Sequence, residues 1–194
     1  MLKFNEQKQI EDINGALALR PQVEQIIDGL GEGFDAIYYL GIGGTYASAM
    51  QAVTYMNGKS NLPVYVQHAA EYYTTGNKRL TEKSIVVLSS VTGTTQEVVQ
   101  AVKEIKTVGA TLIGFIDTKE SILAELCDHT ITYPAPGTEQ IKFFMVADRL
   151  MYNHGEFEDY ETYYQQLEEH LAVGLVEAEK QADAFGLAFA EKHR

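Results

Sequence analysis

Short, continuously apolar runs alternate along the chain with longer stretches in which apolar residues recur every three or four positions. The run Ser84–Leu88 is rich in β-branched residues and is bounded by polar ones, which indicates a buried strand. After it, apolar residues at positions 98, 99, 102 and 105 form one side of an amphipathic helix. Strands are predicted in this way at 35–40, 62–66, 84–88, 110–116 and 130–133. Helices are predicted at 7–30, 46–56, 98–105, 122–127, 138–153 and 159–193, with Pro21 in a first helical turn. The pattern predicts an α/β fold: a five-stranded parallel sheet flanked by helices on both faces, with a long C-terminal helix.

A hydroxyl-rich turn lies between the third predicted strand and the helix after it. Ser90, Thr92, Thr94 and Thr95 supply hydroxyl groups, and Gly93 permits a positive φ angle or the close approach of a ligand. The start of a helix carries unpaired backbone N–H groups and the positive end of the helix dipole, which together favour a phosphate. Ser and Thr are also ordinary N-cap residues, but one cap needs only one hydroxyl. The sequence therefore predicts a phosphate site at this turn.

A glycine-rich turn, Gly41–Thr45, follows the first predicted strand. Tyr46 stands where the third glycine of a dinucleotide-binding fingerprint would be, and Gln67 and His68 stand where its ribose-binding acid is expected. The Gly-Lys-Ser/Thr sequence of a P-loop is absent as well. The turn therefore reads as a segment that lets a ligand lie against the backbone. Both turns follow parallel strands, so both are expected on the rim of the sheet where ligands bind.

The composition limits which kinds of binding partner and which cellular compartment are expected for this chain. The formal net charge of −12 argues against general nucleic-acid binding, and it means that an anionic substrate must be held by local dipoles and a few cations. No apolar run approaches the roughly 20 residues that span a bilayer, and residues 1–6 do not resemble a signal peptide. The single cysteine, Cys127, allows no intrachain disulfide and is expected to be buried. These features favour the cytoplasm and no membrane partner.

Together, the two turns resemble the motifs of the sugar isomerase (SIS) domain. The first matches G-x-G-[TS], and the second matches S-x-[ST]-G-x-T-x-E at positions 90, 92, 93, 95 and 97. The resemblance covers the chain from about Val23 to the C-terminus. It is greatest to the first SIS lobe of fructoselysine- and glucoselysine-6-phosphate deglycases, which are similar to the isomerase half of glutamine–fructose-6-phosphate aminotransferase. The resemblance implies a flavodoxin-like three-layer sandwich that binds a phosphorylated sugar.

The resemblance also implies which residues meet the substrate. The hydroxyls of the second turn would hold the phosphate, the glycine turn would flank the sugar, and the start of the helix after Gly137 would close one side, with Glu139 and Lys142 near it. Val91 stands where the family often has a polar ligand contact. The implied substrate site consists of Gly43, Gly44, Thr45, Ser90, Val91, Thr92, Gly93, Thr95, Thr138 and Gln140.

Catalytic residues are less well marked. Two-lobed members of the family take a catalytic Glu and His from the second lobe, near an E-x-x-H-G-P-like motif that this sequence lacks. Glu71, which the resemblance places near the pocket, and His68, at a strand's carboxyl end, are the candidates for a general acid or base. The other histidines are isolated, with no metal-site spacing, and Glu97 interacts favourably with the helix dipole without any catalytic role. No metal ion or redox cofactor is expected.

The chain divides on this basis into a helical segment (1–34), an SIS phosphosugar-binding domain (35–155) and a C-terminal helix (156–194). That helix has an apolar seam with nothing after it in the chain to cover it, formed by Leu167, Leu171, Leu175, Ala178, Ala182 and Phe185. It is expected to connect to a second lobe or to dock on another subunit in a homodimer or higher oligomer. The tyrosines at 160, 163 and 164 are expected at a subunit contact.

Three functions are compatible with these residues. The first is a lobe of a sugar-phosphate deglycase or isomerase that acts on a 6-phosphorylated ketosamine or hexose. The second is a non-catalytic domain that senses phosphosugars through the same pocket. The third is a stand-alone aldose–ketose isomerase whose site is completed by oligomerisation.

Overall fold

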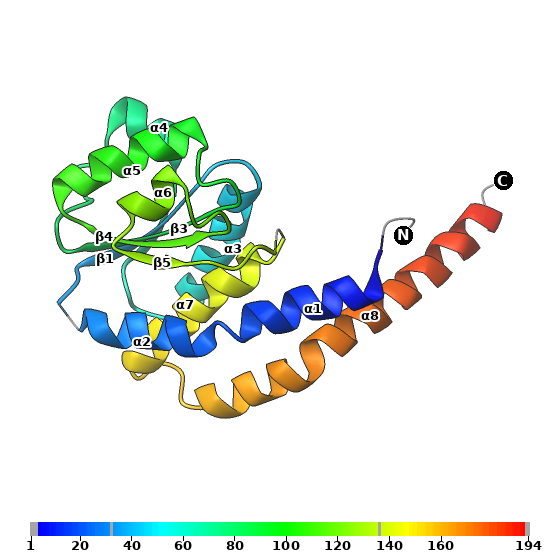
Figure 1. Cartoon of the computed structure of the whole chain (residues 1–194). Coiled ribbons are helices and arrows are strands. Elements are labelled where there is room, and N and C mark those ends of the chain that lie inside the picture. The colour runs from blue at the N-terminus through cyan, green and yellow to red at the C-terminus, as the bar shows by residue number, and fades with distance from the viewer. Residues whose placement is uncertain (1–3, 32, 136, 193–194) are drawn as a thin grey trace.

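The computed structural model describes residues 4–31, 33–135 and 137–192. Within them, five parallel strands form one sheet in the order β2-β1-β3-β4-β5 (Figure 1). The strands are β1 (Ala36–Gly41), β2 (Val64–His68), β3 (Ser84–Ser90), β4 (Thr111–Ile116) and β5 (His129–Ile131). The chain adds β2 on one side of β1 and then crosses back to place β3 on the other side. The strand order therefore reverses between β1 and β3.

Helices cover both faces of the sheet, so the predicted three-layer α/β fold is confirmed (Figure 1). One face carries α4 (Ala69–Thr75), α5 (Gln96–Val108) and α6 (Ile122–Leu126). The other carries α2 (Arg20–Leu30), α3 (Gly44–Asn57) and α7 (Glu139–Asn153). Alternate residues of β1 serve the two cores, with Ile37 and Tyr39 on one face and Tyr38 and Leu40 on the other. Burial on both faces is the reason that the central strands β1, β3 and β4 are mostly apolar.

Several boundaries differ from those predicted. The N-terminal helical segment is two helices, α1 (Glu6–Leu17) and α2, with Pro21 in the first turn of α2 as expected. β3 continues to Ser90, because the last two serines pair with Phe115 and Ile116 of β4. β5 ends at Ile131 instead of residue 133. A seven-residue helix, α4, follows β2 where no helix was predicted.

The last helix, α8 (Tyr160–Lys192), runs beside α1, and the two project together from the sheet (Figure 1). Leu167 and Leu171 pack against the core, so an earlier segment, α1, covers the first part of the predicted seam. Beyond Val176, the described residues of α8 are almost all exposed, Phe185 among them at 72%. Residues 193 and 194, which the prediction included, lie outside the described residues.

The tyrosines of α8 were expected at a subunit contact, but two of the three are buried inside this chain. Tyr160 donates a hydrogen bond to Glu24 at 2.9 Å, and Tyr164 donates one to the buried Asp148 at 2.8 Å. Their rings are therefore buried and their hydroxyl groups are hydrogen-bonded within this chain. Only Tyr163 is substantially exposed, at 36%.

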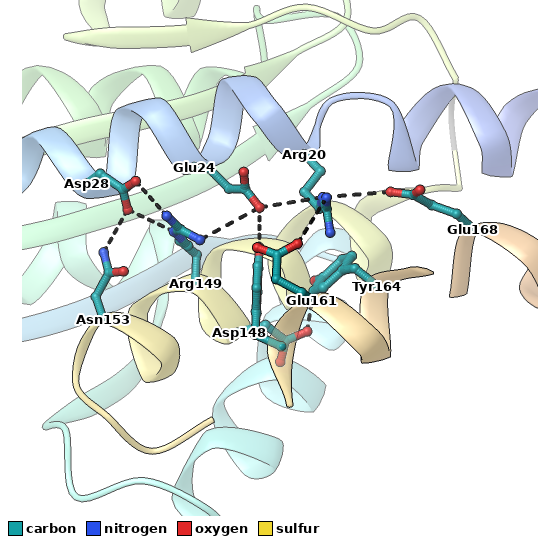
Figure 2. Close-up of polar contacts among 10 residues, drawn as sticks. Arg20, Glu24, Asp28, Asp148, Arg149, Asn153, Glu161, Tyr164 and Glu168 are labelled. Atoms are coloured by element: carbon teal, nitrogen blue, oxygen red, sulfur yellow. Dashed lines mark hydrogen bonds and ion pairs between the residues drawn. The ribbon is translucent and has the colours of Figure 1, made fainter. Parts of the chain in front are cut away.

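A polar network ties α2 to α7 and α8 (Figure 2). Arg149 of α7 forms a two-pronged contact with Asp28 of α2, with Nε–Oδ1 at 2.8 Å and Nη2–Oδ2 at 2.6 Å. Arg20 of α2 reaches Glu161 and Glu168 of α8 at 3.5 and 3.6 Å. Glu24 lies between the two arginines, as Figure 2 shows. The network fixes the start of α8 against the body of the fold.

In the described part of the chain, every helix is too short or too polar to cross a membrane.

Candidate functional site

The two predicted ligand-binding turns lie side by side on the carboxyl rim of the sheet. The glycine turn follows β1 and the hydroxyl turn follows β3, and these strands are paired, with Leu40 opposite Leu88. The strand order reverses between the same two strands. Open parallel sheets bind their ligands at such a reversal, because the connecting segments diverge there and leave a crevice.

The hydroxyls of the second turn have different roles. Ser90 is buried, and its Oγ accepts a hydrogen bond from the Gly93 N–H at 3.0 Å, which shapes the turn. Thr92 and Thr94 are exposed, and the Thr94 hydroxyl donates to Thr92 Oγ1 at 3.1 Å. Gly93 has a φ angle of +64°, in the left-handed region that glycine adopts without strain. One hydroxyl therefore builds the turn, and two more lie at its surface.

The start of α5 is not capped by a side chain. Thr95 occupies the N-cap position, but its hydroxyl makes no capping hydrogen bond. The first N–H groups of a helix have no partner within the helix, and an exposed helix start collects positive potential. Helix capping is the simplest role for a threonine at this position, but the Thr95 side chain does not perform it.

The segment after β4 holds the hydroxyl turn from one side. The Asp117 N–H donates to the Ser90 carbonyl oxygen at 3.1 Å, and the Thr118 hydroxyl donates to the Val91 carbonyl oxygen at 2.9 Å. The Leu123 N–H donates to the Gly93 carbonyl oxygen at 3.1 Å. These bonds occupy carbonyl oxygens of the turn and fix its backbone.

The glycine turn is open where a ligand would approach. A Cβ atom added at Gly43 or Gly44 would have no neighbour within 4 Å, and both residues are exposed. At Gly41, by contrast, an added Cβ would lie 2.7 Å from the Tyr46 nitrogen, so only glycine allows α3 to begin so close to β1. The Thr45 hydroxyl donates to the Ile42 carbonyl oxygen at 2.9 Å and so stabilises the turn itself.

The catalytic candidates lie on the β2 side of the site. His68 ends β2, is half-buried, and packs edge-on against Tyr46 with 5.0 Å between ring centroids. Its Nδ1 is buried without a hydrogen-bond partner in the described residues. Glu71 lies in the first turn of α4 and is exposed. The contact with Tyr46 places His68 beside the glycine turn.

Thr138 and Gln140 face away from the sheet, toward α1 and α8. Thr138 is buried and donates to the Ala135 carbonyl oxygen at 2.8 Å. It also lines a groove of about 300 Å³ with residues of α1 and α8. Gln140 lines a neighbouring groove of about 230 Å³ with Phe144 and Tyr163. Lys142 is the α7 residue whose side chain reaches the rim of the sheet, where it contacts Asp117 after β4.

Sequence reasoning missed the buried ion pair between Asp117 and Lys142. Lys142 Nζ lies 3.0 Å from Asp117 Oδ1, and the two side chains are 5% exposed or less. Burial raises the pKa of Asp117, although the hydrogen bond from Lys142 opposes that rise. Asp117 could have been identified from the sequence, because it directly follows β4 and so lies on the same rim of the sheet as both turns. Lys142 was expected near the substrate from the family resemblance alone, and its burial against Asp117 was not predicted, because a lysine inside an amphipathic helix is ordinarily solvent-exposed.

Among the residues that the structure describes, no group of three or more His, Cys, Asp or Glu side chains could hold a metal ion. Cys127 is buried as expected, and burial raises the pKa of its thiol to about 12.

Comparison with known proteins identifies relatives of this arrangement. A family model described as the SIS domain matches residues 35–147. The chain is 26% identical over 140 residues to glutamine–fructose-6-phosphate aminotransferase (isomerizing) of Pyrococcus horikoshii, a match that covers 70% of this chain and 23% of that protein.

Solved structures share the fold. The C-terminal domain of glucosamine-fructose-6-phosphate aminotransferase from Francisella tularensis matches 95% of this chain and 57% of that chain, with a TM-score of 0.76 and 15% identity. A Salmonella typhimurium LT2 protein assigned as a phosphosugar isomerase matches 86% of this chain and 54% of that chain, with a TM-score of 0.73 and 18% identity. A Listeria monocytogenes protein assigned as a sugar-phosphate isomerase matches 81% of this chain and 91% of that chain, with a TM-score of 0.60 and 19% identity. The chain thus spans about a quarter of the curated relative's length and just over half of the first two structures.

Proposed function

Because this chain belongs to the SIS domain family, we propose that it binds a phosphorylated sugar, or a sugar–amine adduct with a 6-phosphate, at the carboxyl rim of its sheet. The phosphate would lie at the start of α5, against the hydroxyls of the Ser90–Thr95 turn. The sugar would extend over the glycine turn after β1. The ligand would thereby occupy the reversal in strand order.

The observation that carries this proposal is the uncapped start of α5 beside a turn rich in hydroxyls. Thr95 makes no capping bond, and the exposed Thr92 hydroxyl only accepts hydrogen bonds from Thr94, so both hydroxyls can donate to a ligand at the positive end of a helix dipole. A bound anion would also have to overcome a formal net charge of −12. Screening over about 10 Å at 0.1 M salt reduces that long-range repulsion, while contacts within the turn are unaffected.

For the chemistry, we propose deglycation or aldose–ketose isomerisation by a larger assembly. Either reaction opens the sugar ring and moves a proton between C1 and C2, which needs a general base within reach. His68 is the better supported candidate in this chain, because its ring contacts Tyr46 at the end of the glycine turn. Glu71 is a second candidate. The E-x-x-H-G-P-like motif of two-lobed members is absent here, so a second lobe or a second subunit would complete the site.

The test is the affinity of Thr95→Val for fructose 6-phosphate, measured by titration calorimetry. Because the Thr95 hydroxyl makes no capping bond, its loss should leave the unfolding midpoint nearly unchanged. Losing one hydrogen bond to a charged phosphate should weaken binding by about 1.5–3 kcal/mol, or about ten- to a hundredfold. Adding Ser90→Ala should weaken it further.

Thr107→Val is the matched control. Its hydroxyl donates to the Glu104 carbonyl oxygen at the other end of α5, so affinity should not change. Fructose without the phosphate should bind neither protein measurably. Unchanged affinity in the Ser90→Ala, Thr95→Val double variant would contradict the phosphate site.

The second candidate is a domain that senses phosphosugars. It uses the same pocket without turnover. Incubation of the purified chain with fructoselysine 6-phosphate or glucoselysine 6-phosphate separates the two functions. Release of free lysine indicates an enzyme, and binding without release indicates a sensor. Both functions deal with cytoplasmic sugar phosphates.

A further inference from the structure

One side of α8 carries no charged residue over most of the length of the helix. At 3.6 residues per turn, positions that are three, four or seven apart lie on the same side of a helix. The side that contains Leu167 and Phe185 has no Asp, Glu, Lys or Arg within about 60° of it between positions 163 and 189. Because the formal net charge of the chain is −12, two copies repel one another at long range. This uncharged side of α8 is therefore a surface at which two copies can meet without bringing like charges together.

The inner half of the uncharged side is an open groove. A cavity of about 390 Å³ follows α8 and is lined by Tyr163, Leu167, Leu171 and Gly174 with their neighbours. It adjoins the smaller groove beside Phe144 of α7, which shares three of those residues. The buried residues Ala172 and Val176 lie on another side of α8, so the groove stays open while α8 packs against α1.

The outer half of the uncharged side lies on the part of α8 that projects farthest from the sheet (Figure 1). Of the described positions 177 to 192, all but Glu179 are exposed. A helix of about 12–15 residues that packs on nothing is marginal in water, and Gly186 lowers the helix propensity further. A surface that packs against this half would therefore stabilise it.

The spacing of apolar residues matches the two halves to one another. In an antiparallel pair of α8 helices that cross at Ala178, Leu171 of one copy lies opposite Phe185 of the other. Leu167 then lies opposite Phe189, which brings both exposed rings over the groove. The arrangement is two-fold symmetric, so each copy supplies one groove and one outer half, and both are covered at once.

The residues near the crossing point are small. Ala178 lies at the two-fold axis, and Gly174 of one copy lies opposite Ala182 of the other. A Cβ atom added at Gly174 would have no neighbour within 4 Å, so this side of the helix is open to close approach. The distance between packed helix axes is about 8–10 Å and depends on the side chains at the contact, so small residues favour a close crossing here.

We propose that the uncharged side of α8 is the docking surface for a second copy of this chain, with the two helices antiparallel and crossing at Ala178. The outer half of each α8 lies in the groove of the other copy. None of these residues belongs to the proposed phosphate site, so the inference is independent of the proposed function.

Oxidative cross-linking through one introduced cysteine tests the crossing point. A disulfide needs two Cα atoms within about 7 Å, which a residue and its own copy satisfy only near the two-fold axis. Ala178→Cys should therefore form a covalent dimer under mild oxidation, at a concentration where light scattering detects a dimer. Lys180→Cys, at an exposed position on the opposite side of α8, is the matched control and should cross-link at least about tenfold more slowly. Cys127 is buried, so its contribution to cross-linking should be small.

A second pair of variants tests the antiparallel direction. Gly174→Cys and Ala182→Cys should not cross-link alone, because each residue and its copy are about 12 Å apart along the helix axes. A mixture of the two variants, one of them carrying a tag that changes its mass, should give the mixed disulfide. Both positions are exposed, so the unfolding midpoints of the reduced variants should be nearly unchanged.

The pattern of cross-links decides the outcome. Cross-linking of Gly174→Cys and of Ala182→Cys each alone would mean a parallel pair, and it would overturn the inference. Equal cross-linking in Ala178→Cys and Lys180→Cys would mean random collision, and a dimer that Ala178→Cys does not cross-link would mean a different interface. Either result would overturn it. A protein that stays monomeric at every concentration would overturn it as well, and would leave this side of α8 to a further domain or to a different protein.

Discussion

Gly93 lies in the left-handed region, and a Cβ added to it would overlap Ser121 Oγ in the segment after β4. Gly155, between α7 and α8, also has a positive φ angle, +76°, but a Cβ there would have no neighbour within 4 Å. An alanine at Gly155 would therefore introduce backbone strain alone, whereas an alanine at Gly93 would introduce both strain and steric overlap. They also lie in different parts of the molecule, since only Gly93 belongs to the proposed phosphate site.

We expect Gly155→Ala to cost about 1–2 kcal/mol of unfolding free energy, from strain alone. Gly93→Ala should cost about 2–4 kcal/mol, because the overlap with Ser121 adds to the strain. Urea unfolding measures both. Binding of fructose 6-phosphate should weaken in Gly93→Ala and stay unchanged in Gly155→Ala. Equal costs for the two substitutions would mean that Ser121 yields easily and that the turn is not tightly packed.

The sequence allowed the turns to be predicted, but not what each hydroxyl does. Glycines and hydroxyls beside apolar runs are local signals, and both turns were found from them at the rim of the sheet. Whether Ser90 shapes the turn or faces a ligand depends on a backbone bend that the residue type does not determine. The Asp117–Lys142 pair joins residues 25 positions apart, so it follows only from how α7 packs.

Two carboxylates beside or within α7 have pKa values shifted in opposite directions. One is Asp148 of α7 itself, and the other is Asp28 of α2, which is bonded to Arg149 of α7. Burial raises the pKa of Asp148, which accepts hydrogen bonds from Tyr55 of α3 and Tyr164 of α8. The hydrogen bond from Arg149 of α7 lowers the pKa of Asp28 on α2. Figure 2 shows both carboxylates in the network that joins these helices. The stability of the packing around α7 should therefore respond to pH in two opposing ways.

The signs follow from which state binds the proton. The folded state retains a proton on Asp148 at pH values where the unfolded chain has released it, so ionisation of Asp148 on raising the pH costs stability. For Asp28 the contribution is present above the unfolded pKa and is lost as the pH falls through the folded pKa. The gain in unfolding free energy from about pH 3, below the unfolded pKa of an aspartate, to about pH 7 should thus be larger in Asp148→Asn than in the unaltered protein, and smaller in Asp28→Asn. Chemical denaturation at the two pH values tests this order, and the reverse order would contradict both assignments.

Elements were predictable where one type of signal dominated. β1, β3 and β4 are long apolar runs and α5 has strong helical spacing, so these elements were located from the sequence. The edge strand β2 begins and ends two residues later than predicted. β5 is short and only its last residue is buried, so its end was misplaced by two residues. The break between α1 and α2 and the short α4 depend on packing and on turn geometry, which periodicity does not report.

α1 and α8 form an extension whose outer described residues are largely exposed. Phe185, Leu187 and Phe189 are 72%, 69% and 56% exposed. Phe185 and Phe189 stack on one another with 6.2 Å between ring centroids, which makes one apolar surface. The sequence predicted an uncovered apolar seam along this helix. Within the described residues, α1 covers the inner part of that seam, and Phe185 in its outer part is exposed.

We expect this outer surface to mediate self-association, because burying an exposed phenylalanine in a contact contributes about 1.5–3 kcal/mol. Light scattering across a dilution series should show a species larger than the monomer that dissociates on dilution. Phe185→Ser with Phe189→Ser should shift the protein to the monomer without changing its unfolding midpoint, since both side chains lie outside the core. Ile122→Ser, at an apolar residue of α6 that is 37% exposed, is the matched control and should leave association unchanged. A protein that stays monomeric at every concentration would refute the role of this surface, and would leave the site on the sheet to act within one chain.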